Sequence, residues 1–298
     1  MKNSIVDTCA LCGNVKELKL SHIIPKFVFR YLKKDSFTGK LRSLSNVNVP
    51  VQDGDKQYLL CDSCEGDFNR NETKFANAIF FPFKNEGFQT FSYDGNWLKL
   101  FITSVNWRTL YLDLPGFEHP EDEENSINKN QLKALKKAEE SMRLYLKGEK
   151  RTLDNIESHI FFFDQVKNAD EKVADTGPHR LMQGGVFDYT IITKEDGIYV
   201  FANLAGIIII TIIKKEKNEL WKNTFVKNET GKLKTPQSSN SKIFSEIFYV
   251  ANKRNEAFSK MSDKQREQIQ QKIESDIKGF KESGSYQRIV KDQKINTE

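Results

Sequence analysis

The sequence is short of the features that most quickly place a protein in a class. It has only 7 prolines beside a charged fraction of 29%, which argues against a largely disordered chain. Its most apolar run, Gly206 to Ile213, is far too short to span a bilayer, which takes about 20 residues. The N-terminal residues 1–8 lack the apolar core of a signal peptide. We therefore expect a soluble, cytoplasmic protein with no membrane partner.

Several catalytic signatures are missing as well. The chain has no phosphate-cradling glycine loop, no nucleophile elbow and no dinucleotide fingerprint. Its formal net charge of +5 is well short of a tail that coats nucleic acid. The charge is uneven, however, because residues 1–45 contain 9 basic and 3 acidic side chains. This excess indicates either a solvated surface or a face that attracts phosphate.

Cysteine is scarce too, and its placement is the strongest pattern in the chain. All 4 cysteines lie in two Cys-x-x-Cys pairs, Cys9 with Cys12 and Cys61 with Cys64. In a reducing compartment such pairs favour a metal over a disulfide. Four thiolates form the closed shell of a structural zinc site, whereas a catalytic dithiol would explain one pair but not both. We expect one Zn²⁺ that holds residues 1–85 in their fold, the alternative being buried or redox cysteines.

A single histidine lies between the two pairs. His22 follows a short alternating strand and begins an apolar run that Pro25 closes. The helix expected after the second pair carries Glu65, Asn69 and Glu72 on one face, at positions i, i+4 and i+7. If zinc folds the two pairs together, that face can lie opposite His22. A neutral imidazole opposite oxygen ligands suits metal-assisted phosphodiester hydrolysis, in which the histidine takes a proton from water.

The order of these features resembles the zinc-stapled branch of the HNH nucleases, also called His-Me finger or ββα-metal nucleases. The shared order is Cys-x-x-Cys, strand, xHxxP, variable loop, LLCxxC and helix, within residues 9–80. The resemblance implies His22 as the general base, and Glu65 and Asn69 as ligands of a catalytic Mg²⁺ or Mn²⁺. The SHIIPKF and LLCxxCE patterns are also similar to bacterial HNH-like proteins, some of them associated with mobile elements and phage defence.

Two positions depart from the family pattern. Ser21 stands where the family usually has Asp, Glu or His, and a hydroxyl is a much weaker metal ligand. Lys56 and Gln57 lie where the family usually has the Asn that orients the base. Two interpretations follow: a variant site with Glu72 as an added ligand, or a degenerate domain that binds nucleic acid without cutting it.

The fold class that we predict is α+β. Residues 1–84 should form a small zinc-stapled, ββα-metal-like domain, and residues 85–298 a larger α+β domain with an antiparallel sheet. Proline should end the helix after Cys64 at Pro82 and the buried helix from Trp97 at Pro115. The remaining expected elements are a helix opened by Pro25, helices at 128–147, 243–251 and 262–280, strands at 156–166, 186–192, 198–203 and 207–213, and a frayed tail from 283.

Two functional hypotheses result. The first is a metal-dependent HNH-type endonuclease acting on DNA or RNA, with Lys26 and Arg30 as phosphate contacts. Its larger domain would supply regulation or bind a protein partner. The second is a non-catalytic zinc-knuckle module that binds nucleic acid or protein, in which His22 is merely packed and the acidic helix face is solvated.

Overall fold

The computed structural model describes residues 5–43, 46–121, 126–164, 168–169 and 171–297. The strands are β1 (Ile5–Thr8), β2 (Val15–His22), β3 (Leu41–Arg42), β4 (Pro50–Val51), β5 (Lys56–Cys61), β6 (Phe91–Tyr93), β7 (Glu157–Phe162), β8 (Asn168–Ala169), β9 (Val186–Ile192), β10 (Ile198–Leu204), β11 (Ile207–Lys214), β12 (Trp221–Lys222), β13 (Gly231–Leu233), β14 (Ser238–Ser239) and β15 (Asn296–Thr297). The helices are α1 (Lys26–Asp35), α2 (Asp62–Phe75), the π-helical turn η1 (Ala76–Phe80), α3 (Phe81–Glu86), α4 (Trp97–Glu118), α5 (Lys129–Leu146), α6 (Glu171–Asp175), α7 (Pro178–Gln183), α8 (Ile243–Ser259), α9 (Asp263–Ser275), α10 (Ile277–Glu282) and α11 (Gly284–Asp292).

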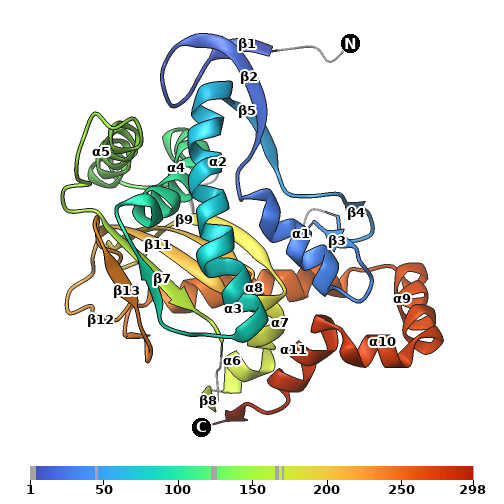
Figure 1. Cartoon of the computed structure of the whole chain (residues 1–298). Coiled ribbons are helices and arrows are strands. Elements are labelled where there is room, and N and C mark those ends of the chain that lie inside the picture. The colour runs from blue at the N-terminus through green and yellow to red at the C-terminus, as the bar shows by residue number, and fades with distance from the viewer. Residues whose placement is uncertain (1–4, 44–45, 122–125, 165–167, 170, 298) are drawn as a thin grey trace.

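The predicted α+β class is confirmed. The N-terminal part contains a three-stranded antiparallel sheet in the order β1-β2-β5, and α2 follows β5 directly. The larger part contains a four-stranded antiparallel sheet in the order β7-β11-β10-β9. Figure 1 shows α2 running from the small sheet towards the large one, so this helix connects the two parts of the molecule.

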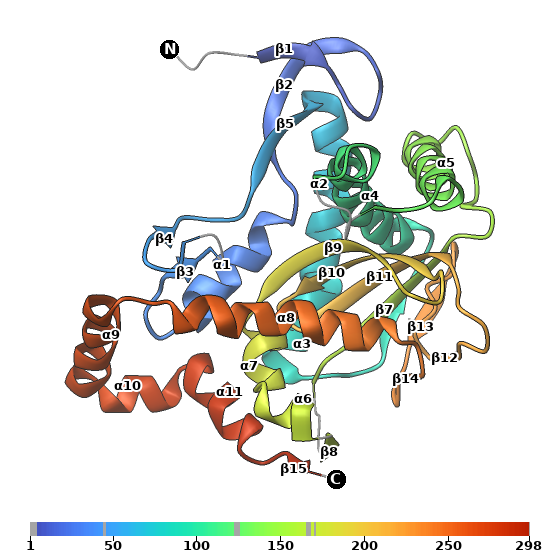
Figure 2. The same ribbon diagram turned by 180° about the vertical axis from the view of Figure 1, so that it is seen from behind.

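The large sheet is covered by helices on both faces (Figures 1 and 2). On β11, Ile207 and Ile209 lie in the buried cluster that contains α4 residues, whereas Ile208, Ile210 and Ile212 lie in the cluster that contains α8 residues. Side chains of a strand alternate between its two faces, so an all-apolar strand needs a cover on each side. The strand expected at 207–213 is therefore confirmed, and it lies inside the sheet with a cover on each face.

Two predicted helix ends are wrong, and both involve proline. The chain does not stop at Pro82: α2 continues through η1 into α3, where Pro82 lies in the first turn. The π-helical turn η1 lies immediately before α3, so the path already departs from regular α-helical hydrogen bonding where the proline N–H is missing. Similarly, α4 contains Pro115 and ends at Glu118. The carbonyl of Pro115 accepts the N–H of His119, so the helix closes one turn later.

The predicted frayed tail is also wrong, because residues 284–292 form α11. The Ser283 hydroxyl caps this helix by accepting the N–H of Tyr286. At its other end the Asp292 carboxylate accepts the backbone N–H groups of His179 and Arg180 on α7. The contacts of Asp292 join segments more than one hundred residues apart. Local sequence patterns do not reveal such contacts.

The two predicted domains share buried clusters. Val28 of α1 and Phe75 of α2 lie in the same cluster as Phe101 of α4 and Ile207 of β11. The rings of Phe75 and Phe101 are stacked, with centroids 3.9 Å apart. A boundary near residue 84 stays a prediction, and the packing shows that the N-terminal part rests on the larger one. None of the helices in the described ranges has the length and apolar character that crossing a membrane would require.

Candidate functional site

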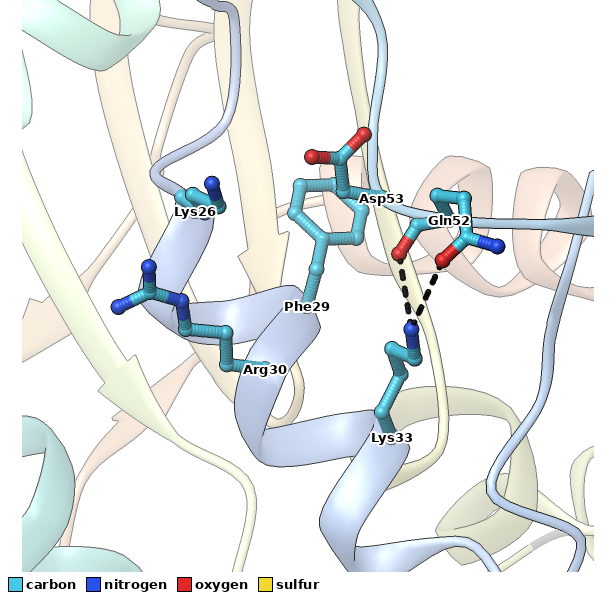
Figure 3. A pocket seen from close by; sticks show the side chains of 6 residues that line it. All are labelled: Lys26, Phe29, Arg30, Lys33, Gln52 and Asp53. Atoms are coloured by element: carbon cyan, nitrogen blue, oxygen red, sulfur yellow. Dashed lines mark hydrogen bonds between the residues drawn. The ribbon is translucent and has the colours of Figure 1, made fainter.

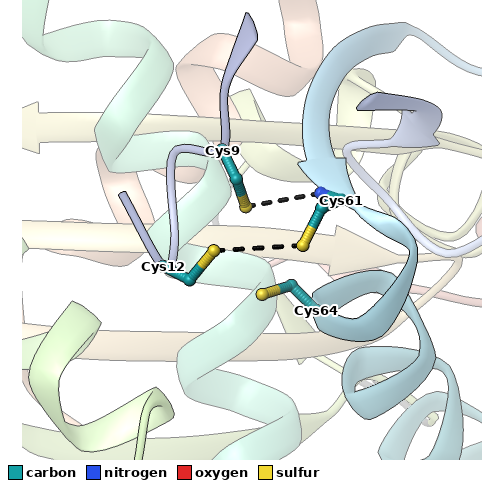
Figure 4. Close-up of side chains that lie close together, drawn as sticks. All are labelled: Cys9, Cys12, Cys61 and Cys64. Carbon is teal, nitrogen blue, oxygen red and sulfur yellow. Dashed lines mark hydrogen bonds between the residues drawn. The ribbon is translucent and has the colours of Figure 1, made fainter. Parts of the chain in front are cut away.

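The four cysteines converge at one end of the small sheet (Figure 4). Cys9 and Cys12 lie in the turn between β1 and β2, while Cys61 ends β5 and Cys64 lies in the first turn of α2. Their sulfur atoms all lie within 4.8 Å of one another. None of the four forms a disulfide. The closing of one antiparallel strand pair, β2 with β5, brings the two sequence pairs together.

This cluster could hold a metal ion such as zinc. The Sγ atoms of Cys12 and Cys61 are 3.9 Å apart. Tetrahedral ligands about 2.3 Å from a zinc ion lie about 3.8 Å from one another, so the spacing fits. Burial raises the pKa of the Cys61 thiol, but hydrogen bonds from Ser63 and Cys64 outweigh it and lower that pKa, whereas burial raises the pKa of the neighbouring Cys64. A thiol with a low pKa is readily deprotonated, as metal binding requires.

The second constellation surrounds His22 at the end of β2. Its Nε2 atom is 3.1 Å from Oδ2 of Asp53, and the other oxygen of Asp53 is 2.9 Å from Nζ of Lys56. The His22 side chain is only 17% exposed. The hydrogen bond from Lys56 lowers the pKa of Asp53, and the hydrogen bond with His22 lowers it further. Asp53 is therefore an ionised partner for the imidazole.

Asp53 is a site residue that the sequence interpretation missed. It lies in the stretch before β5, in the variable loop of the family order. The strand register contains the missing signal, because His22 lies opposite Lys56. Once β2 and β5 are paired, the residues just before Lys56 must approach His22. The register itself, however, cannot be read from the composition of this stretch.

Helix α1 holds the Asp53 segment in place. A Cβ atom added at Gly54 would lie 2.1 Å from the ring of Phe29, so the backbone there approaches the ring closely. Two residues earlier, Nζ of Lys33 donates to both the main-chain and side-chain oxygens of Gln52, each at 3.3 Å (Figure 3). Asp53 is thus fixed from both sides by contacts with α1.

Between α1 and this segment lies a pocket of about 320 Å³ (Figure 3). Lys26 and Arg30, the predicted phosphate contacts, both line it and are exposed. The other lining residues are Phe29, Lys33, Gln52 and Asp53. Three cations and one carboxylate therefore face the same space, and Asp53 connects that space to His22.

The predicted metal ligand Glu65 contacts Ser21, the residue next to His22 on β2. Ser21 is fully buried, and its hydroxyl donates to Oε2 of Glu65 over 2.6 Å. Ser21 and His22 are consecutive residues at the end of β2, so the Glu65 carboxylate is bonded to the strand one residue before the predicted base. The structure nevertheless brings together the two positions, 21 and 65, that the family resemblance assigns to metal ligands.

The other two residues of the predicted ligand face, Asn69 and Glu72, have different surroundings. Asn69 is exposed on α2. Glu72 forms an ion pair with Arg108 of α4, with Oε1 and a guanidinium nitrogen 2.7 Å apart. This pairing argues against Glu72 as the added metal ligand, because its carboxylate is already neutralised. Arg108 is the second residue that the sequence interpretation missed. In the sequence it is a single arginine in a mostly apolar helix, and nothing there shows that its side chain is buried.

Within the described ranges, the cysteine cluster is the one group in which three or more His, Cys, Asp or Glu ligand atoms come together. A second cation would therefore depend on few protein ligands. Comparisons with protein-family models, curated proteins and solved structures give no match. The functional argument thus depends on the site geometry.

Proposed function

We propose that this protein is a metal-dependent endonuclease of the HNH type that hydrolyses phosphodiester bonds in DNA or RNA. One observation carries the proposal: Asp53 both holds the His22 ring and lines a pocket with Lys26 and Arg30. A proton acceptor and a pair of exposed cations are thereby joined at one place. That combination suits an anionic substrate attacked by water.

In this proposal His22 is the general base. In the tautomer in which Nε2 donates to Asp53, the Nδ1 atom keeps a lone pair that can take a proton from water. Asp53 would fix the tautomer and the ring orientation, while Lys56 keeps Asp53 ionised. Lys26 and Arg30 would bind the phosphates on either side of the cleaved bond.

A divalent cation such as Mg²⁺ or Mn²⁺ fits the oxygen donors at Glu65. Magnesium is commonly held by one or two carboxylates together with waters and substrate phosphates, so Glu65 with a phosphate can suffice. When bound, the cation would neutralise the phosphate and stabilise the leaving oxygen. Ser21 would orient the Glu65 carboxylate through its hydrogen bond, and Asn69, one turn along α2, is the second candidate ligand.

The four cysteines would have a structural role in the same enzyme. A shell of four thiolates leaves no open position for a substrate, so zinc there would hold β5 and α2 against the turn between β1 and β2. Zinc would therefore build the frame on which both His22 and Glu65 are mounted.

A second candidate function is nucleic-acid binding without cleavage. It is favoured by Ser21, a weak ligand in place of the usual acid or histidine, and by the Glu72 ion pair with Arg108. Under this alternative the pocket lined by Lys26 and Arg30 binds the phosphate backbone, and a protein partner binds the larger part of the chain.

The deciding experiment is cleavage of plasmid DNA and of RNA with Mg²⁺ or Mn²⁺, alongside a binding assay. We expect the wild type to cut, and His22→Ala to lose at least about a hundredfold in rate, the usual contribution of a general base. His119→Ala is the matched control, since His119 is exposed at the end of α4 and should be dispensable. Folded wild-type protein that binds but does not cut would support the second function. Protein that does neither would contradict both.

A further inference from the structure

Arg108 is the most deeply buried charged side chain in contact with the candidate site. It lies on α4 and is only 1% exposed. A guanidinium cannot lose its charge under ordinary conditions, so burial is tolerated only where partners satisfy it. The identity of those partners therefore shows which parts of the molecule Arg108 holds together.

Two of its hydrogen-bond partners belong to the elements that carry the candidate catalytic residues. One terminal nitrogen donates to the main-chain oxygen of His22 over 2.7 Å, and the other to Glu72 over 2.7 Å. The Nε atom donates to the carbonyl of Ser104 on its own helix over 3.2 Å. The guanidinium also lies over the ring of Phe68, 5.3 Å from its centroid. One side chain thus contacts both the end of β2 and the middle of α2.

These contacts fix the position of the end of β2 relative to α2. His22 is held through its own carbonyl, and Glu65 lies on the same helix as Glu72, about 10 Å back along α2 at 1.5 Å per residue. A charge-assisted hydrogen bond is shorter and roughly twice as strong as a neutral one. Arg108 therefore sets the strand end that carries the base relative to the helix that carries the carboxylate.

The helix that presents Arg108 is itself anchored in the large sheet. The next residue, Thr109, donates to Asp188 of β9 over 2.7 Å. One turn earlier, Asn106 donates to the carbonyl of Val200 on β10 and to the hydroxyl of Thr211 on β11. The larger part of the chain thus reaches the N-terminal site through a rigid, hydrogen-bonded helix.

We propose that Arg108 is a positioning residue for the candidate nuclease site, and that Glu72 is its counter-ion and not a metal ligand. The inference rests on the proposed function. It gives the larger part of the chain a defined task, which is to hold the His22 strand end and the Glu65 helix in a fixed arrangement.

The test compares two kinds of variant. Glu72→Gln removes the carboxylate but leaves the contact between Arg108 and His22 available, so kcat should stay within about threefold of the wild type. The double variant Arg108→Met/Glu72→Leu removes both charges, and replacing a buried ion pair by apolar residues often preserves stability. It also removes the donor to His22, so kcat should fall about a hundredfold with KM nearly unchanged, the cost of misplacing a catalytic group by about 1 Å.

Two readouts separate positioning from folding. The first is the urea midpoint, measured also for Glu118→Leu/Lys136→Met, a control that removes an exposed ion pair of α4 and α5. The second is the NMR signal of the His22 ring, which can be assigned because the chain has 4 histidines. In the Arg108 double variant this signal should shift or broaden, whereas in the control double variant it should not.

Each outcome decides the proposal. A double variant with the wild-type urea midpoint, wild-type kcat and an unchanged His22 signal would overturn the positioning role. A large kcat loss in Glu72→Gln would overturn the counter-ion role. If the double variant does not fold, Arg108→Lys replaces it, since a lysine cannot reach both partners and should lower kcat while keeping the charge. If the wild type cuts nothing, the nuclease function fails and the His22 signal alone decides whether Arg108 positions the ring.

Discussion

The cysteine cluster and the His22 pocket lie at opposite ends of the same strand pair, yet they are built differently. The cluster needs only the pairing of β2 with β5, because each Cys-x-x-Cys pair is already local in the sequence. The histidine site needs α1 and the segment before β5, which form the pocket, and a buried arginine from α4, which contacts the main chain of His22. The first site is encoded locally, and the second is assembled by tertiary contacts.

The two sites differ in the same way in their exposure. Three of the four cysteines are buried, whereas the pocket presents the exposed cations Lys26 and Arg30. A closed thiolate shell stabilises a fold, while an open cationic surface binds a ligand. Damage to the first should therefore change stability, and damage to the second should change binding or rate. The following predictions test that division, from the largest effect to the smallest.

Loss of the zinc ion that we expect at the cysteine cluster should have the largest effect. In Cys61→Ser, or after treatment with a strong chelator, we expect β1, β2, β5 and α2 to unfold. Structural zinc contributes about 10–16 kcal/mol in small zinc-binding peptides, as much as the whole stability of a typical domain. Hydrogen exchange with mass spectrometry measures the loss region by region, and elemental analysis gives the zinc content.

A matched variant sharpens this test. Ser63→Ala removes a hydroxyl 3.3 Å from the Cys61 sulfur but leaves the four thiols in place, so it should retain the metal. If the metal-free protein keeps its exchange protection in β2 and β5, the cysteine cluster is not what holds the N-terminal part together.

The same contrast explains what could be predicted from the sequence. The cysteines, the strand ending at His22 and the antiparallel strands between 186 and 213 follow from spacing and periodicity, which are local. Asp53 and Arg108 do not, because each becomes a site residue only through a partner 31 or 86 positions away. Glu72 illustrates this limit of local patterns. Helical spacing predicts the face of α2 on which Glu72 lies, but it cannot identify the partner, Arg108.

Proline shows the same limit for the fold. Pro82 and Pro115 were expected to end helices on local grounds, and in both places the helical path continues past the expected end. The aromatic rings around η1 bury Phe80 completely, and this burial favours continuing the helical path. Local rules identify where a helix can stop, but burial decides whether it does.

Asp188, which accepts a hydrogen bond from α4, should make the stability of the protein depend on pH. Burial raises the pKa of Asp188 to about 6, and the nearby Asp113 and Asp55 add to this while Arg108 opposes it. Between about pH 4 and pH 6 the unfolded chain has lost this proton and the folded chain still holds it, so stability falls as pH rises. Asp188→Asn should remove this fall and be up to about 3 kcal/mol more stable than the wild type at pH 7.

The control for this prediction is the pH itself. At pH 4 the wild-type carboxyl is largely protonated in the folded state, so the two proteins should then unfold at nearly the same urea concentration. Asparagine can still accept the hydrogen bond of Thr109. An advantage of Asp188→Asn that is equally large at pH 4 and pH 7 would mean that the effect is packing and not ionisation.

The contact between Gly54 and Phe29 should give a smaller, local effect. Gly54→Ala places a Cβ atom 2.1 Å from the ring, and such overpacking costs about 1–3 kcal/mol. Because Asp53 is the preceding residue, its alignment with His22 should suffer as well. Gly66→Ala is the control: a Cβ there meets nothing within 4 Å, and alanine favours the helix. Equal urea midpoints for the two variants would show that the Asp53 segment is not held by α1.

The smallest effect on stability, and the most specific one on binding, is expected for the cations of α1. Lys26→Gln and Arg30→Gln should leave the urea midpoint unchanged but weaken nucleic-acid binding, each lowering the slope of log K against log[salt] by about 1 for duplex substrates. Lys34→Gln is matched in charge, helix and exposure, but Lys34 does not line the pocket. It should leave the slope unchanged. Because a salt slope counts phosphate contacts, an equal change in all three variants would mean that the whole helix attracts nucleic acid by its charge. A change confined to Lys26 and Arg30 would place the phosphates beside Asp53 and His22, where hydrolysis requires them.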